Sequence, residues 1–109
     1  MNKKIPQDQV VESFRVRVQA DQLKTFMAGV EDVETFLITL RGYVGTEILL
    51  LSDQELMVLI RWENCTLFEE NMVGIITSPI IQKWMNTAEL LSQQPCISKT
   101  HYLSTKKAD

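Results

Sequence analysis

The fold is decided by residues 43–62, which read YVGTEILLLSDQELMVLIRW. Two apolar segments, residues 43–51 and 55–62, flank a short polar turn at residues 52–54. Apolar runs on either side of a short polar turn predict two strands joined as an antiparallel β-hairpin. The first of these strands is apolar at each of residues 48–51, so both of its faces should be covered.

Upstream of the hairpin, the pattern predicts one strand and one helix. From Val10 the apolar residues alternate with polar ones, which is typical of a β-strand. Asp21 is the predicted N-cap of an amphipathic helix, and Gly42 stands where that helix should have stopped. The apolar residues of the strand and then of the helix are Phe14, Val16, Val18, Leu23, Phe26, Met27, Val30, Val33 and Leu37.

Downstream of the hairpin, the pattern predicts a broken helix and a last strand. Asn64 or Thr66 can cap the helix at its start. The Ser-Pro pair at residues 78–79 restarts it with proline in the first turn, and its apolar stripe runs over residues 81–91. After the next proline, residues 96–104 are predicted to form the last strand.

The order strand, helix, strand, strand, helix, strand predicts a ferredoxin-like α+β subunit. Right-handed crossovers give a four-stranded antiparallel sheet with the helices on one face and the second and fourth strands at the edges. An edge strand that is apolar on both faces, as residues 48–51 are, needs a cover. A second copy, sheet against sheet, is the simplest cover. The sequence therefore predicts a homodimer.

The composition is that of one globular domain. The chain has 109 residues, of which 45% are hydrophobic and 23% are charged. We expect a single domain over residues 10–104, with a flexible lead-in at residues 1–9 and a tail at residues 105–109.

Charge, hydropathy and cysteine content exclude several classes of partner. The formal net charge of -3 argues against nucleic acid. The longest apolar run, residues 56–60, is far shorter than the ~18 residues of a membrane helix, and no apolar leader follows Met1. A single histidine and two cysteines argue against a metal site. The expected location is the cytoplasm.

Three short motifs carry a resemblance to a known family. Arg41-Gly42-Tyr43-Val44-Gly45 leads into the second strand, Trp62-Glu63-Asn64 ends the third, and Ser78-Pro79 lies in the later helix. With the element order, they resemble the antibiotic-biosynthesis-monooxygenase-like family. The resemblance implies a dimeric α+β barrel with a pocket between sheet and helices in each subunit. Its members include cofactor-independent oxygenases of quinol-like or polyketide aromatics and haem-degrading enzymes.

The residues on which those activities depend do not carry over. The polyketide oxygenases pair the strand tryptophan with an asparagine, and this chain has Val58 at that position. They also carry a helix arginine, whereas this chain has Gln and Lys at the nearby residues 82–83. The haem-degrading branch uses a strand Asn, a helix Trp and a helix His. The corresponding stretches are residues 13–15, Asn71 and residues 80–81. The resemblance therefore implies a fold and a pocket, without a mechanism.

Five polar or aromatic residues are candidates for orienting a ligand. Trp62 and Trp84 can stack against a flat aromatic molecule, although both also suit core packing. His101 titrates near neutral pH and is a candidate base, or a hydrogen-bonded structural residue. Asn64 and Asn71 complete the set of candidates.

A second group of residues offers charge or reactivity. Arg15, Arg17 and Arg61 can share one face of the central strands. They can anchor an anion or form salt bridges at an interface, for example with Glu47. Cys65 lies at a predicted helix N-terminus, which lowers the pKa of a thiol, but no partner for nucleophilic catalysis stands near it in sequence.

Three functions fit this pattern. The first is an oxygenase that needs no metal or flavin and acts on a small aromatic, quinol-like substrate. The second is a non-catalytic module of the same fold that binds a small ligand or a partner. The third is haem degradation, for which haem would be the cofactor. For all three we predict an apolar cavity bounded by Phe26, Met72 and Trp84, opening near the helix break.

Overall fold

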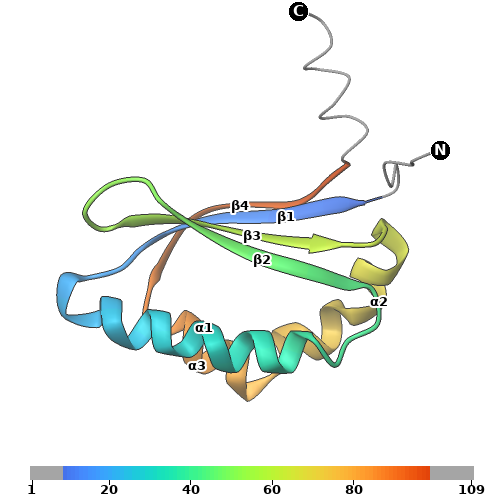
Figure 1. Cartoon of the computed structure of the whole chain (residues 1–109), viewed down its shortest axis with the longest axis horizontal. Helices are drawn as coiled ribbons and strands as arrows, with labels where there is room; N and C mark the ends of the chain where they lie inside the picture. The colour runs from blue at the N-terminus through green and yellow to red at the C-terminus, as the bar shows by residue number, and fades with distance from the viewer. Residues whose placement is uncertain (1–8, 99–109) are drawn as a thin grey trace, which may run out of the picture.

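The computed structural model describes residues 9–98, which form one sheet and one layer of helices (Figure 1). No helix among these residues is long and apolar enough to cross a membrane. The elements in chain order are β1 (Val10–Arg17), the 3₁₀ turn η1 (Ala20–Gln22), α1 (Leu23–Leu37), β2 (Tyr43–Leu50), β3 (Glu55–Trp62), α2 (Cys65–Ile76), α3 (Pro79–Met85) and β4 (Glu89–Ser98).

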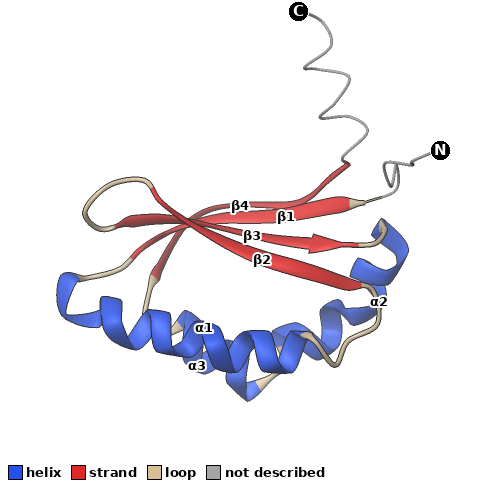
Figure 2. Cartoon of the chain, viewed as in Figure 1, coloured by secondary structure: helices blue, strands red, loops and turns tan. Residues whose placement is uncertain are grey.

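The sheet confirms the predicted ferredoxin-like topology. Its order is β2-β3-β1-β4, every pairing is antiparallel, and β2 and β4 are the edges. The three helices cover one face, and among the described residues no element covers the other (Figure 2). The hairpin runs between β2 and β3, where Ile48 pairs with Val58 and Leu50 with Leu56.

The core lies between the sheet and the helices. Strands β1 and β3 alternate between buried and half-buried residues, as strands do when one face is packed. The apolar stripe of α1 lies over them, as its spacing predicts. The largest side chains buried here are the aromatic ones, Trp62, Trp84, Phe14, Phe26 and Phe68.

The break in the second helical region is built from local signals. The Asn64 side chain accepts a hydrogen bond of 2.8 Å from the Leu67 N–H and caps α2, so Asn64 and not Thr66 is the N-cap. Ser78 caps α3, and Pro79 occupies its first turn, as predicted. A new N-cap at Ser78 starts a second helix, so α2 and α3 are two separate helices and not one continuous helix.

Two predicted boundaries are wrong. Asp21 lies inside η1, and Gln22 precedes α1 without a capping hydrogen bond from its side chain. The last strand begins at Glu89 and not at residue 96, so the predicted helical stripe to residue 91 ends early, at the close of α3. Proline is tolerated in an edge strand at a bulge, and β4 shifts register opposite Val11 and Ser13, around its own proline. Residues 99–104 of the predicted strand lie outside the described residues.

The turn before β2 yields a test of packing. Gly42 has φ of +93°, and a Cβ placed there would lie 2.7 Å from the Leu67 Cβ. Gly42→Ala should therefore lower the free energy of unfolding by roughly 2 kcal/mol, measured by urea denaturation.

The matched control for this turn is Gly74→Ala, on the exposed side of α2. Nothing lies within 4 Å of an added Cβ there. Because alanine favours the helix, this variant should be more stable than the wild type by roughly 0.5–1 kcal/mol. Equal stability of wild type and Gly42→Ala would contradict the packing described.

Candidate functional site

A cavity of about 150 Å³, open to solvent on one side, lies between the sheet and the helices. Its floor comes from β1, β3 and β4, and its roof from all three helices. The lining side chains are apolar or aromatic apart from Glu12 and Gln93. The remaining lining residues are Phe14, Leu37, Ile60, Met72, Ile75, Ile76, Ile81, Met85 and Leu90.

Glu12 is the ionisable group of this lining. It lies on the inward face of β1, two residues before Phe14, and is only 6% exposed. Burial disfavours the charged carboxylate and raises the pKa of Glu12 from 4.5 to about 7. The Trp62 indole N–H lies near enough to favour the charged form and offset part of this effect. A carboxyl group with this pKa can take or give a proton near neutral pH.

The Trp62 indole N–H is a buried donor near the Glu12 carboxyl that forms no well-aligned hydrogen bond among the described residues. The Trp62 side chain is fully buried. Edge contacts hold the ring, with centroids 5.9 Å from Tyr43 and 6.1 Å from Phe68. A buried N–H without a well-aligned partner loses about 1–3 kcal/mol of hydration that a ligand oxygen can restore.

The cavity opens between β4 and the break that separates α2 from α3. Its lining includes Ile76 at the end of α2, which is 57% exposed, and Leu90 on β4, which is 47% exposed. Gln93 of β4 is also exposed and lines the same cavity. The opening is therefore bordered by Ile76, Leu90 and Gln93, while Glu12 and Trp62 are buried.

Trp84 of α3 forms a wall of the cavity. It is 3% exposed, stacks on Phe26 with ring centroids 5.1 Å apart, and donates a 3.1 Å hydrogen bond from Nε1 to the Phe26 carbonyl oxygen. Because its N–H is already used, Trp84 offers the cavity an apolar surface only.

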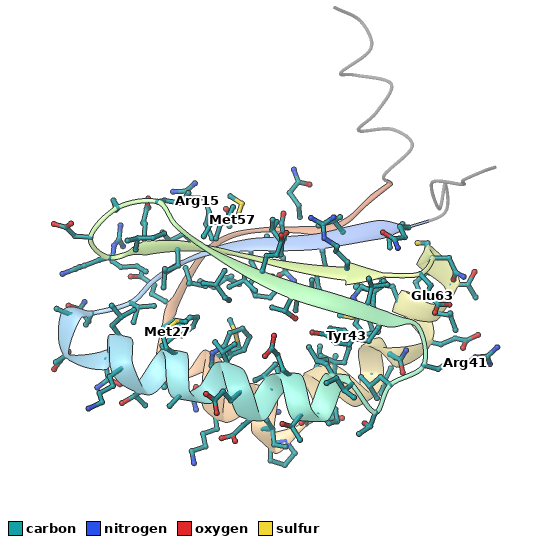
Figure 3. All side chains as sticks on the ribbon, in the orientation of Figure 1. Arg15, Met27, Arg41, Tyr43, Met57 and Glu63 are labelled. Carbon is teal, nitrogen blue, oxygen red and sulfur yellow. The ribbon has the colours of Figure 1, made fainter. Side chains whose placement is uncertain are left out.

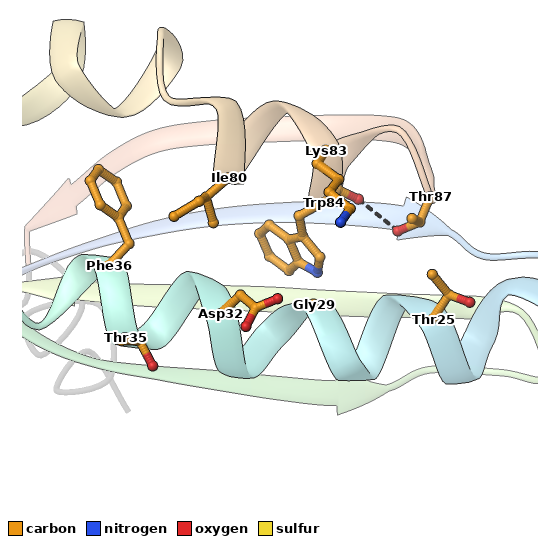
Figure 4. Close-up of a pocket in the computed structure, with 9 residues that line it drawn as sticks. All are labelled: Thr25, Gly29, Asp32, Thr35, Phe36, Ile80, Lys83, Trp84 and Thr87. Atoms are coloured by element: carbon orange, nitrogen blue, oxygen red, sulfur yellow. Dashed lines mark hydrogen bonds between the residues drawn. The ribbon is translucent and has the colours of Figure 1, made fainter.

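A second hollow lies on the outer side of the same wall. It is a groove of about 350 Å³ between α1 and α3, in which Asp32 and Lys83 stand on opposite sides (Figure 4). Trp84 lines this groove as well as the cavity. Gly29 allows the close approach of the indole, since a Cβ there would lie 2.8 Å from Trp84 Cδ1.

The predicted ligand residues fall into three groups. Trp62, Met72 and Trp84 line the cavity, whereas Phe26 lies behind Trp84 and does not. Asn64 caps α2. The remaining candidate, His101, lies outside the described residues.

Asn71 has a structural role in this fold. Its Nδ2 donates hydrogen bonds to the Arg41 carbonyl oxygen at 2.9 Å and to the Leu67 carbonyl oxygen at 2.8 Å. The bond to Arg41 ties α2 to the turn before β2, whereas the bond to Leu67 lies within α2. Like Asn64, it therefore satisfies backbone groups and is absent from the cavity lining.

The predicted charged residues lie on the open face of the sheet. Arg15 pairs with Glu55 at 2.9 Å and Arg61 with Glu47 at 2.7 Å, the second as predicted. Arg15 and Met57 point away from the helices in Figure 3. Arg17 forms a third pair at 3.1 Å, with the first residue of β4. These arginines are therefore remote from the cavity.

Cys65, at the start of α2, is exposed, and its Sγ lies 3.6 Å from Glu69 Oε2. Cys65 is also absent from the cavity lining.

Sequence reasoning missed Glu12 and Gln93. The signal for Glu12 was present, because strand alternation places it on the same face as Phe14, Val16 and Val18. Gln93 gave no such signal, since β4 was predicted to begin after it.

Haem does not fit this cavity. A volume of about 150 Å³ is below the ~300 Å³ at which pockets for drug-sized ligands begin, and haem is larger than such ligands. Residues 80–81, where the haem-degrading enzymes are expected to carry a histidine, are both isoleucine. Across residues 9–98, no group of three His, Cys, Asp or Glu side chains is placed to hold a metal ion.

The raised pKa of Glu12 predicts a pH-dependent stability. Between its ordinary pKa of 4.5 and about 7, the folded chain keeps a proton on Glu12 that the unfolded chain has released. The free energy of unfolding should fall as the pH rises through this window, by roughly 3 kcal/mol. Urea denaturation across the window measures it, and Glu12→Gln should abolish the Glu12 contribution. A wild type and variant that differ by a constant amount at every pH would contradict the burial.

Comparisons with known proteins bear on the fold. No protein-family model matches the chain, and no curated protein matches its sequence. Several solved structures are similar to it, among them the three that follow. MupZ from Pseudomonas fluorescens has a TM-score of 0.71 at 8% identity, over 93% of this chain and 80% of that one. SnoaB from Streptomyces nogalater, a cofactor-independent oxygenase, has a TM-score of 0.64 at 13% identity, over 84% and 92%.

The third structure comes from Nitrosomonas europaea and is named as a candidate antibiotic biosynthesis monooxygenase. Its TM-score is 0.63 at 11% identity, over 88% of this chain and 94% of that one. Such identities show likeness of fold and leave activity to be argued from the site. The chain has the fold of the antibiotic biosynthesis monooxygenases, as the resemblance in its sequence predicted.

Proposed function

We propose that this chain is a monooxygenase that acts on a small hydroxylated, quinol-like aromatic without a metal or flavin. The observation that carries the proposal is the apolar cavity in which the buried Glu12 carboxyl lies beside the Trp62 N–H. The similarity to SnoaB, a cofactor-independent oxygenase, is consistent with it.

Glu12 is the proposed general base. A base works best when its pKa is near the working pH, and burial raises the pKa of Glu12 to about 7. Its carboxylate takes the hydroxyl proton of the substrate, and the resulting aromatic anion reduces oxygen. The substrate loses two hydrogens and gains one oxygen atom to become a quinone. The second oxygen atom leaves as water with those hydrogens, so no external reductant is needed.

Trp62 is proposed to hold the oxygen from which the proton is taken. An indole N–H donates a hydrogen bond, and the hydroxyl oxygen becomes a stronger acceptor as it acquires negative charge. The apolar walls keep water away from the anion and so favour its reaction with oxygen. The chain thus supplies deprotonation, one oriented donor and a dry site.

The direct test is oxygen uptake with a panel of phenols and quinols. Glu12→Gln keeps the size of the side chain but removes the base, so uptake should fall by about 10²–10⁴-fold. Loss of activity should not reflect unfolding, because the variant lacks the buried charge and is expected to be at least as stable at neutral pH. Glu31→Gln, at an exposed position on α1, is the control and should keep the wild-type rate.

The same assay separates the oxygenase from the non-catalytic alternative. Ligands that bind in the cavity while no member of the panel is consumed would contradict the oxygenase and favour a ligand-binding module. Wild-type uptake in Glu12→Gln would instead contradict the role of Glu12.

We also propose that the open face of the sheet is covered by a second copy of the chain. Leu49, Met57 and Leu59 lie on this face, and Leu49 is 47% exposed. The arginines around them are paired with glutamates of the same sheet. Charges that are already paired cost less to bury than isolated ones, so the face suits an interface between identical chains.

Sedimentation at micromolar concentration tests the dimer. Leu59→Glu places an unpaired charge at the centre of the face and should shift the dimer to monomer. Val73→Glu, on an exposed part of α2 where Val73 is 70% exposed, should leave the dimer intact. A wild type that sediments as a monomer would contradict the proposal.

A further inference from the structure

The size of the cavity limits what the proposed enzyme can accept. An apolar cavity of about 150 Å³ holds a molecule the size of benzene. Fused ring systems of two or three rings need more space than this. The site has a volume for one aromatic ring, with its polar groups gathered on the floor.

Two of the polar groups on the floor, those of Glu12 and Trp62, lie close together. Val10 pairs with Trp62 and Glu12 with Ile60, so Glu12 and Trp62 are diagonal neighbours on one face of adjacent strands. Both groups can therefore bind the same oxygen atom, with Glu12 accepting its proton and Trp62 donating to it. The ring of such a phenol then extends toward the helices.

Trp84 closes the cavity on the helix side. Its indole lines both the cavity and the outer groove of about 350 Å³, so it separates the two spaces. Its stacking on Phe26 and its hydrogen bond to the Phe26 carbonyl hold the ring in this position. A smaller side chain here would extend the cavity toward the groove.

We infer that the substrate is a phenol or quinol with a single ring, and that the Trp84 indole sets this limit by closing the cavity against the groove between α1 and α3. The inference rests on the proposed function for the identity of the site. It goes beyond that function because it names the ring number and the residue that enforces it.

The test measures binding of three stable probes by calorimetry: phenol, α-naphthol and a hydroxyanthracene. Wild-type protein should bind phenol, bind α-naphthol at least about tenfold more weakly, and show no binding of the hydroxyanthracene. Trp84→Phe keeps an aromatic ring against Phe26 but is smaller. It should bind α-naphthol about tenfold more tightly than the wild type and phenol more weakly.

Two further variants make the size test specific. Met85→Ala enlarges the cavity from another part of its lining and should also improve α-naphthol binding. Phe36→Leu is the control, because Phe36 lines the groove and is absent from the cavity lining. It should keep the wild-type order of probes. Circular dichroism confirms that each variant is folded.

The outcomes distinguish the inference from the proposed function. Equal affinity of the wild type for phenol and the hydroxyanthracene overturns the size limit, whether or not oxygen is consumed. Ring-size selectivity without oxygen uptake supports the size limit and contradicts the oxygenase. A protein that binds none of the three probes overturns the inference. If Trp84→Phe and Met85→Ala both keep the wild-type preference for phenol over α-naphthol, the role of the Trp84 indole in limiting ring size is overturned.

Discussion

The burial of a carboxyl group on the inward face of β1 is the constraint on which the site depends. Strand β1 is paired on both sides, by β3 and β4, and covered by helices, so Glu12 cannot turn to solvent without breaking the sheet. Burying an ionisable group with few polar neighbours lowers stability. An apolar residue would pack here at lower cost. A glutamate that lowers stability at this position is therefore best explained by a catalytic or binding role.

Much of the fold could be predicted from local sequence patterns. The wrong prediction at the start of β4 arose where pairing with a distant strand decides the secondary structure. The β3 strand and the caps Asn64 and Ser78 have strong signals, and the structure has them at the predicted residues. Strand β4, in contrast, reads ELLSQQPCIS, which has no period of two and contains a proline. It is a strand because β1 offers it an unpaired edge. Nothing in the local sequence of residues 89–98 indicates that this edge is available. The apolar stripe therefore predicted helix as far as residue 91, across the first residues of β4.

The site was less predictable than the fold because its residues act through contacts between strands. Asn64 and Asn71 have the amide chemistry of ligand-binding residues, yet both satisfy backbone groups nearby. A sequence cannot separate these roles. Alternation places Glu12 on the apolar face of β1. Whether it has a polar neighbour there depends on the register of β1 and β3, which brings it beside Trp62. Where the polyketide oxygenases are expected to carry asparagine this chain has Val58, and the proposed base, Glu12, lies on a different strand of the sheet.

The alternation of β1 also links the site to the open face of the sheet. Glu12 and Phe14 point into the cavity, while Ser13 and Arg15, their neighbours in the chain, point outward. The Arg15–Glu55 pair joins β1 to β3 from outside, at the strands that hold Glu12 and Trp62 from inside. Covering this face would restrict movement of both strands. A base and a donor that must meet one oxygen atom need a floor that does not flex. The proposed dimer would therefore serve the chemistry of each subunit without contributing a residue to its cavity.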